Sequence, residues 1–135
     1  MQHISGGCLC GAIRYVAETE PTFTAVCHCR NCQKQTGTSA SLIVGLPAGS
    51  LKVSGALKTF RDSGGSGKNV DRRFCPECGS PILTDVEAMP SLTFLKAGTL
   101  DDTSWLKPAI EIYCDSAQRW VQHIDGAQRF PKGPV

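Results

Sequence analysis

The 135-residue sequence has no long hydrophobic run, no run of like charges and no strong net charge. Its longest nearly uncharged apolar stretch, residues 38–51, is interrupted by Gly45, Pro47 and Gly49, so it cannot span a bilayer. The net charge of +2 is too small to indicate a nucleic acid or an anionic membrane as partner. Residues 1–5 lack the basic start and apolar run of a signal peptide. We therefore expect a cytoplasmic protein.

The composition is that of a soluble globular protein, with 41% apolar and 19% charged residues. A chain of this length can bury one hydrophobic core. The sequence thus predicts a single domain over residues 1–135, and it does not indicate an oligomeric state.

Cysteine, by contrast, is abundant. Seven of the eight cysteines fall into three closely spaced groups: Cys8 and Cys10; Cys27, Cys29 and Cys32; Cys75 and Cys78. In a cytoplasmic protein, where thiols stay reduced, Cys-x-Cys and Cys-x-x-Cys spacings favour metal binding over a disulfide framework.

The three groups predict two zinc sites of unequal completeness. The two outer pairs together supply four thiolates, which would close a tetrahedral site of the structural kind. The three central thiols would hold a second zinc with one open position, as a catalytic zinc requires. Two alternatives remain for the central group: a closed structural site with a fourth protein ligand, and a redox-active or metal-free thiol cluster.

Local patterns support convergence of the thiols within each group. Cys27 and Cys29 would share one face of a strand, and residues 31–37 suit a single helical turn closed by Gly37, which carries Cys32 towards them. Glycines on both sides of Cys8 and Cys10 let the backbone bend. Residues 75–79, Cys-Pro-Glu-Cys-Gly, have the composition of a zinc knuckle.

Many short alternating segments separated by turn signals predict a mainly β domain with a few short helical turns. Strands are expected over residues 12–18, 22–26, 39–45, 51–54, 57–60, 70–74, 82–85, 92–97 and 109–114. The fourth and fifth of these would form a hairpin around Gly55. Residues 62–69 are expected to form a flexible loop, and residues 117–121 a short helical turn capped by Ser116.

Several other side chains could support a site. His28 lies between two ligand cysteines and would face away from them, in a packing or supporting role. Cys114 is expected to be a buried inert thiol, with fourth ligand or resolving cysteine as minor options. His3 and His123 are expected to be solvated.

Basic and aromatic residues have ordinary explanations as well as functional ones. Surface charge is the simple interpretation of four basic residues near the cysteines: Arg30, Lys34, Arg72 and Arg73. Such cations would also stabilise thiolates and attract an anionic thiol. Core or lid positions are expected for Trp105, Trp120 and Phe130.

Three motifs occur in order: Gly-Gly-Cys-x-Cys-Gly, Cys-His-Cys-x-x-Cys followed by Thr36-Gly37, and Phe-Cys-Pro-x-Cys-Gly-Ser. This pattern resembles the glutathione-dependent formaldehyde-activating (Gfa) family, also called the centromere-protein-V/Gfa domain. The resemblance implies an Mss4-like β-tent fold stitched by zinc knuckles. It also implies one structural zinc on the four outer cysteines, Cys8, Cys10, Cys75 and Cys78, and one catalytic zinc on the three central cysteines, Cys27, Cys29 and Cys32.

From the resemblance we expect a zinc-dependent carbon–sulfur lyase acting on a thiol–aldehyde adduct such as S-hydroxymethylglutathione, with a glutathione-like thiol as its small-molecule partner. The alternative is a non-catalytic zinc-binding thiol carrier or protein-interaction module. Many family members carry a histidine where this chain has Glu111. No general acid or base is obvious in the sequence, and Glu111, Asp71 and His28 are the candidates.

Overall fold

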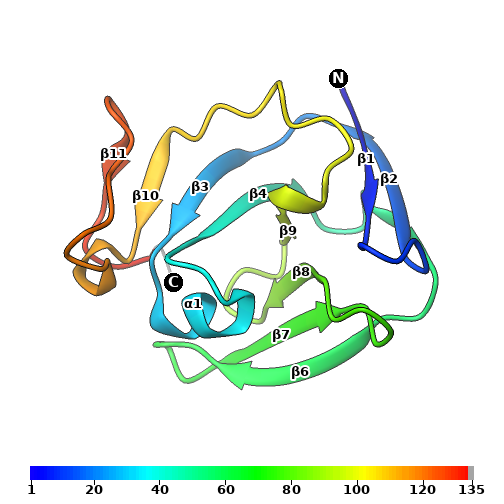
Figure 1. Ribbon diagram of the computed structural model, residues 1–135, viewed down its shortest axis with the longest axis horizontal. Helices are drawn as coiled ribbons and strands as arrows, with labels where there is room; N and C mark the ends of the chain where they lie inside the picture. Colours follow the sequence, from blue (N-terminus) through cyan, green and yellow to red (C-terminus); the bar gives the residue numbers. More distant parts are fainter. Residues whose placement is uncertain (134–135) are drawn as a thin grey trace.

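Two β-sheets form most of the structure, a computed structural model described over residues 1–133 (Figure 1). The smaller sheet is antiparallel, in the order β1 (Gln2–Gly7), β2 (Arg14–Thr19), β5 (Lys52–Ser54). The larger sheet has the order β11 (Gln128–Arg129), β10 (Ile110–Ile112), β3 (Phe23–Cys27), β4 (Ser41–Pro47), β9 (Leu92–Lys96), β8 (Pro81–Val86), β7 (Asn69–Phe74), β6 (Lys58–Ser63). The prediction of a mainly β protein is confirmed.

One α-helix occurs in the described residues, α1 (Arg30–Thr36), directly after β3. Gly37 ends it with a left-handed backbone at φ 67°, which confirms the predicted helical turn and its glycine cap. Two short 3₁₀ helices follow later, η1 (Ala97–Thr99) and η2 (Cys114–Ser116). None of the helices in residues 1–133 is long and apolar enough to cross a membrane.

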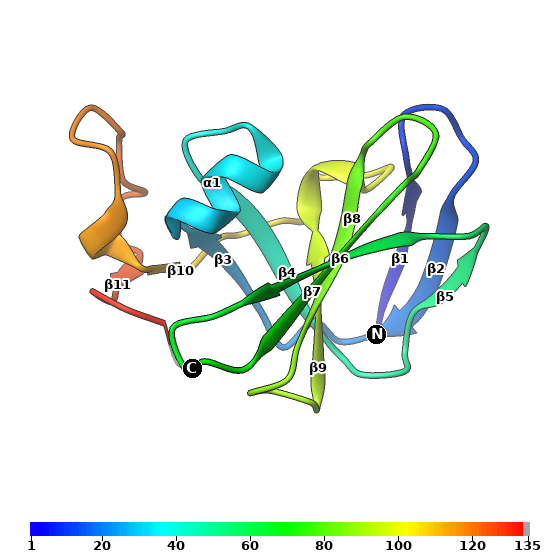
Figure 2. The ribbon, with the colours of Figure 1, turned by 90° about the horizontal axis from the view of Figure 1, so that it is seen from below.

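The central strands of the larger sheet carry apolar side chains on both faces. On β4, Val44 and Leu46 belong to a core cluster shared with the smaller sheet, whereas Ile43 belongs to a second cluster on the opposite face. On β9, Leu95 and Phe94 divide in the same way, as the period-2 alternation of a strand requires. The first cluster is covered by the smaller sheet, which stands to one side of the larger sheet in Figure 2.

Four expectations about local structure need correction. The predicted hairpin around Gly55 is wrong, because β5 pairs with β2 in the smaller sheet while β6 pairs with β7 in the larger one. Alternation within two short segments indicates strands but not their partners. The expected loop over residues 62–69 is too long, because residues 62–63 end β6 and residue 69 begins β7, and only residues 64–68 form the turn, in which the Gly64 amide bonds to the Lys68 carbonyl.

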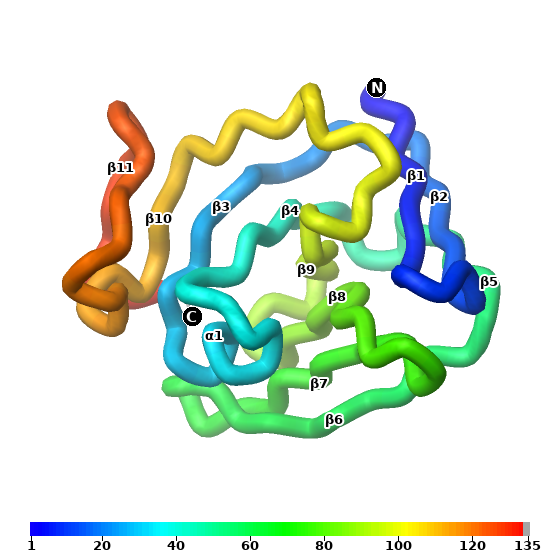
Figure 3. Tube along the Cα trace, viewed as in Figure 1, coloured from blue at the N-terminus to red at the C-terminus, as the bar shows by residue number. Residues whose placement is uncertain are grey.

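Residues 117–121, predicted as a helical turn, contain a hydrogen-bonded turn from the Val121 amide to the Gln118 carbonyl but no helix, and the short 3₁₀ helix η2 lies just before them. Strands β1 and β11 were not expected. Figure 3 shows β1 and β11 at opposite ends of the molecule.

Candidate metal centres and the adjoining pocket

The four outer cysteines meet where the β1–β2 turn of the smaller sheet approaches the β7–β8 turn of the larger sheet. Their sulfurs all lie within 4.8 Å of one another, with 3.6 Å between Cys8 and Cys10 and 3.8 Å between Cys10 and Cys75. Zinc–sulfur bonds of about 2.3 Å in a tetrahedron place the sulfurs about 3.8 Å apart. The four thiols therefore lie close enough together to hold one zinc ion.

Backbone and hydroxyl groups around the four-thiol site favour thiolates. The Ile13 amide donates to the Cys8 sulfur at 3.2 Å. The Ser80 hydroxyl lies 3.2 Å from the Cys78 sulfur, and hydrogen bonds from Ser80 lower the pKa of Cys78 to about 5. Ser80 also accepts from the Leu9 amide, which links the two turns directly. Gly79, at φ 81°, takes the left-handed conformation that closes the knuckle.

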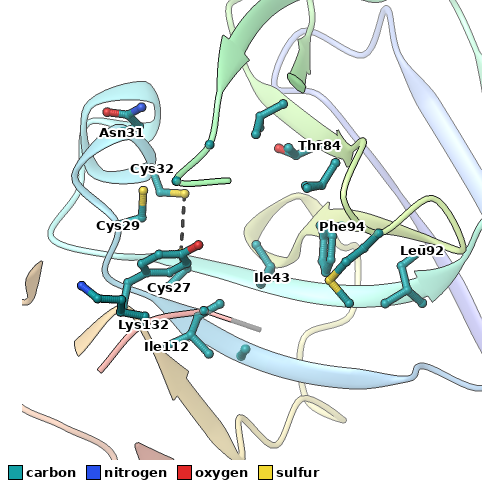
Figure 4. Close-up of a pocket in the computed structure, with 18 of the residues that line it drawn as sticks. Cys27, Cys29, Asn31, Cys32, Ile43, Thr84, Leu92, Phe94, Ile112 and Lys132 are labelled. Atoms are coloured by element: carbon teal, nitrogen blue, oxygen red, sulfur yellow. Dashed lines mark hydrogen bonds between the residues drawn. The ribbon is translucent and has the colours of Figure 1, made fainter. Parts of the chain in front are cut away.

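The three central cysteines come from the end of β3 and the first turn of α1. Cys27 and Cys32 have their sulfurs 3.6 Å apart, and Cys29 lies beside them on the same pocket. Figure 4 shows the three side chains together at one end of a pocket. The proximity of the three thiols lowers the pKa of Cys29 and raises the pKa of Cys27. The neighbouring Cys27 and Cys32 thiols thus favour a thiolate at Cys29. A bound metal would replace the thiol protons of Cys27 and Cys32.

Two buried cations lie beside the central thiols. Arg72 is 4% exposed, and its Nη1 lies 3.6 Å from the Cys32 sulfur while its Nε donates to Asp62 at 3.1 Å. Burial opposes the charge of Arg72, but the Cys32 thiolate and Asp62 outweigh it and raise its pKa. Burial lowers the pKa of Lys96, whose Nζ donates to the Ser41 hydroxyl. Arg72 therefore serves the thiol cluster and is not the surface charge expected from the sequence.

The pocket that begins at the central thiols has a volume of about 590 Å³, within the range of small-molecule sites. It is lined by the second apolar cluster and by residues 63–66 of the β6–β7 turn. Cys27, Cys29 and Cys32 are the only potential metal ligands of the cysteine, histidine or carboxylate type among its lining residues within 1–133. The open side of the three thiols thus faces a cavity and not a fourth such side chain.

Tyr113 is a pocket residue that sequence reasoning missed. It is the one non-glycine residue among the described positions with a left-handed backbone, at φ 54°, a conformation that costs such residues free energy and often marks functional positions. Burial and the neighbouring thiolates raise its pKa. Lone tyrosines give no spacing signal, so only the structure identifies it.

Behind the central thiols, Glu111 forms a buried hydrogen-bonded network. It is 1% exposed, and its Oε1 lies 2.7 Å from Nε2 of His28 and 2.7 Å from Nδ1 of His123. The Ile124 amide donates to Oε2. Burial raises the pKa of Glu111, but these hydrogen bonds outweigh it and lower the pKa to about 2. An ionised carboxylate only accepts, so both histidine nitrogens must carry hydrogen.

This network corrects one expectation and explains another. His123 is half-buried and bonded, not solvated as expected. His28 is 1% exposed and faces away from its neighbouring cysteines, as predicted. Because His28 lies between Cys27 and Cys29, its bond to Glu111 fixes the backbone that presents both thiols.

Together with Cys114, the network forms a second set of potential ligand atoms within 4.8 Å of one another. Two ligands at 2.0–2.1 Å from a tetrahedral zinc lie about 3.3 Å apart, whereas both histidine nitrogens lie 2.7 Å from the same carboxylate oxygen. These are hydrogen-bond distances. We therefore interpret the set as a network that positions the backbone.

The remaining candidates lie away from the pocket or at its rim. Asp71 pairs with Arg61 on the opposite face of β7 from Arg72, and neither Glu111 nor His28 lines the pocket. The three general acid or base candidates are thus remote from the cavity. His3 is exposed beside Glu18, Arg30 donates to Gln33, and Arg73 pairs with Asp85.

The aromatic candidates take three different positions. Trp105 packs against the first core cluster, as expected. Trp120 is 71% exposed and belongs to neither core nor lid, which corrects the expectation. Phe130 is partly exposed and lines the pocket.

Comparisons with known proteins agree with the fold and with the family resemblance. Residues 3–116 match the family described as glutathione-dependent formaldehyde-activating enzyme. A crystal structure of a protein from Rhodobacter sphaeroides is similar, with a TM-score of 0.59 and 22% identity over 77% of this chain and 91% of that one. At this identity the likeness shows the fold alone. No curated protein sequence matches significantly.

Proposed function

Because the chain belongs to the glutathione-dependent formaldehyde-activating family, we propose that it makes or breaks the carbon–sulfur bond of a thiol–aldehyde adduct such as S-hydroxymethylglutathione. The observation that carries this proposal is the convergence of Cys27, Cys29 and Cys32 at one end of an open pocket. We assign two zinc ions per chain, one to these three thiols and a structural one to the four-thiol site. Residues 1–135 would act as one zinc-binding domain.

In the bond-breaking direction, the adduct hydroxyl loses its proton to solvent and its oxygen becomes the aldehyde carbonyl. The electron pair of the carbon–sulfur bond leaves with sulfur as a thiolate. A zinc ion on the three central thiols would stabilise that thiolate at its open position and act as a Lewis acid. Arg72 adds positive charge beside Cys32, and His28 holds the backbone between Cys27 and Cys29.

A second candidate function is a non-catalytic thiol carrier. The observation that favours it is the lack of a histidine or carboxylate, the side chains that most often act as general bases, among the pocket-lining residues within 1–133. The two functions share thiol binding and differ in turnover. Both suit a reducing compartment such as the cytoplasm, because all eight cysteines are free thiols.

The test has two stages. Elemental analysis should find close to two zinc ions per chain, and after cobalt substitution a saturating thiol should change the thiolate charge-transfer bands. An unchanged spectrum would contradict a thiol site. The second stage measures the exchange of ¹³C-formaldehyde with its thiol adduct by NMR magnetisation transfer. An enzyme should accelerate this exchange, and Cys32→Ala should abolish the acceleration. A carrier should bind the thiol without changing the exchange rate.

A further inference from the structure

The pocket beyond the central thiols is apolar for most of its length. Figure 4 shows the three cysteines at one end, Ile43 and Ile112 between, and Phe94 and Leu92 at the other end. These side chains come from β4, β10 and β9, so the floor of the pocket is one face of the larger sheet. Leu92, Ile112 and several neighbours are only partly buried around the small second cluster. This face of the sheet therefore keeps apolar surface that the chain itself does not cover.

Charged groups are few in the pocket and already engaged. The charged lining residues among the described positions are Arg72, Lys96 and Lys132. Arg72 is bonded to Asp62 and Cys32, and Lys96 is 7% exposed and donates to Ser41. Lys132 lies at the rim, 3.6 Å from Asp115. The two buried cations therefore present almost no surface to a ligand carboxylate, and Lys132 is the exposed cation among the described lining residues.

Glutathione suits such a cavity poorly. It carries two carboxylates and an ammonium group, and no aspartate or glutamate among the lining residues within 1–133 could receive the ammonium. Burying a polar group without a partner is unfavourable, whereas burying an alkyl or aromatic group against this surface is favourable. The chemistry of the wall thus selects against a charged peptide and for an apolar substituent.

We propose that the thiol handled at the central site is apolar, with its sulfur at Cys27, Cys29 and Cys32 and its alkyl chain or aromatic ring along the pocket towards Phe94 and Leu92. The inference rests on the proposed function. It keeps the reaction, and it replaces glutathione with an apolar thiol as the substrate class.

A chain-length series tests the substrate class on the zinc-loaded protein. Ethanethiol, butanethiol and hexanethiol are titrated by calorimetry, with 2-mercaptoethanol and glutathione as polar comparisons. Affinity should rise about fourfold for each methylene group that enters the pocket, and hexanethiol should bind far more tightly than glutathione. An affinity independent of chain length, or glutathione binding more tightly than hexanethiol, overturns the inference.

Two variants test whether the dependence of affinity on alkyl chain length arises in the pocket. Val86 lines the pocket opposite Val70 on neighbouring strands, so Val86→Asp should flatten the chain-length dependence. Val16→Asp, a matched change at an exposed position on β2 outside the pocket, should leave it intact. If Val86→Asp keeps the full dependence, the chain lies elsewhere and the inference is wrong. Should Val86→Asp fail to fold, the series on the unmodified protein still decides.

The same titrations distinguish this inference from the proposed function. Cys32→Ala should abolish binding of every thiol, including ethanethiol. If no thiol binds the unmodified protein, or if Cys32→Ala binds them equally well, the central site is not a thiol site and the proposed function fails. If thiols bind through Cys32 without regard to chain length, only the apolar substrate class fails.

Discussion

The two thiol sites use the same ligand atoms and differ in what they connect. The four-thiol site joins cysteines 65 residues apart in the chain and brings a turn of the smaller sheet against a turn of the larger one. The central thiols come from six consecutive residues at the junction of β3 and α1. A metal that closes a long loop contributes its binding free energy to folding, whereas one held within a single turn cross-links little of the fold.

Their surroundings differ as well. Amide and hydroxyl donors from the two turns hold the sulfurs of the four-thiol site. The central thiols have Arg72 on one side and an apolar cavity on the other. Both sites offer the same sulfur ligands, so the proposed division into a structural and a reactive site rests on chain separation and on access to a cavity.

The largest effect is expected from Cys78→Ala. Losing one of four ligands weakens the link between the two sheets, and structural zinc contributes about 10–16 kcal/mol in small domains, comparable with the whole stability of a protein. The melting temperature should fall by more than about 10 °C, or soluble expression should be lost. Thermal melts and zinc content measure this. A melting temperature close to that of the unmodified protein would show that the four cysteines do not hold the fold together.

Cys32→Ala should affect thiol binding strongly and the melting temperature only slightly. Zinc content should fall from two ions to one and thiol binding should be lost, while the melting temperature shifts by less than about 5 °C because six consecutive residues close no long loop. Cys114→Ala, a thiol of neither site, is the control and should keep both zinc ions. If Cys32→Ala lowers the melting temperature as much as Cys78→Ala does, the central site is structural and the two sites do not differ as proposed.

Glu111→Gln probes the support behind the central thiols. Removing the carboxylate weakens the bonds from His28 and His123, with an expected loss of about 1–3 kcal/mol in the free energy of unfolding. The folded pKa of Glu111, about 2, lies below its ordinary value, so its contribution is complete above the unfolded pKa near 4.3 and is lost as pH falls towards 2. Urea unfolding from pH 6 to pH 3 should therefore show the stability difference between the two proteins shrinking with acidity. A difference that does not depend on pH would mean that the carboxylate is not ionised in the network.

The smallest effect is expected from Arg72→Lys. Lysine keeps the positive charge but has a single nitrogen, which cannot reach Cys32 and Asp62 as the two guanidinium nitrogens do. Thiol affinity should fall a few-fold, with zinc in the four-thiol site unchanged. Calorimetric titration and zinc analysis measure both quantities. Loss of zinc from the four-thiol site in this variant would show that the two sites are coupled.

Much of the site could be predicted from spacing. The glycine-flanked pairs Cys8/Cys10 and Cys75/Cys78 are distant in sequence, yet their composition predicted a shared site, and the structure places their sulfurs together. Cys27, Cys29 and Cys32 converge because the period of a strand and one helical turn are local properties. The same alternation predicted that the His28 side chain faces away from Cys27 and Cys29. Assignment of zinc and of catalysis to these thiols remains a prediction.

The sequence by itself determined features that depend on local geometry: the strands other than β1 and β11, the turn closed by Gly37 and the grouping of the thiols. Only the tertiary structure decided which strands pair, and so that β5 and β6 lie in different sheets. It also decided that Glu111 and His123 meet His28, that Arg72 reaches Cys32, and that one apolar face of the larger sheet stays open as a pocket. The physical reason is that such contacts join residues 12 to 83 positions apart, whose approach depends on the packing of whole sheets and leaves no short-range periodicity in the chain.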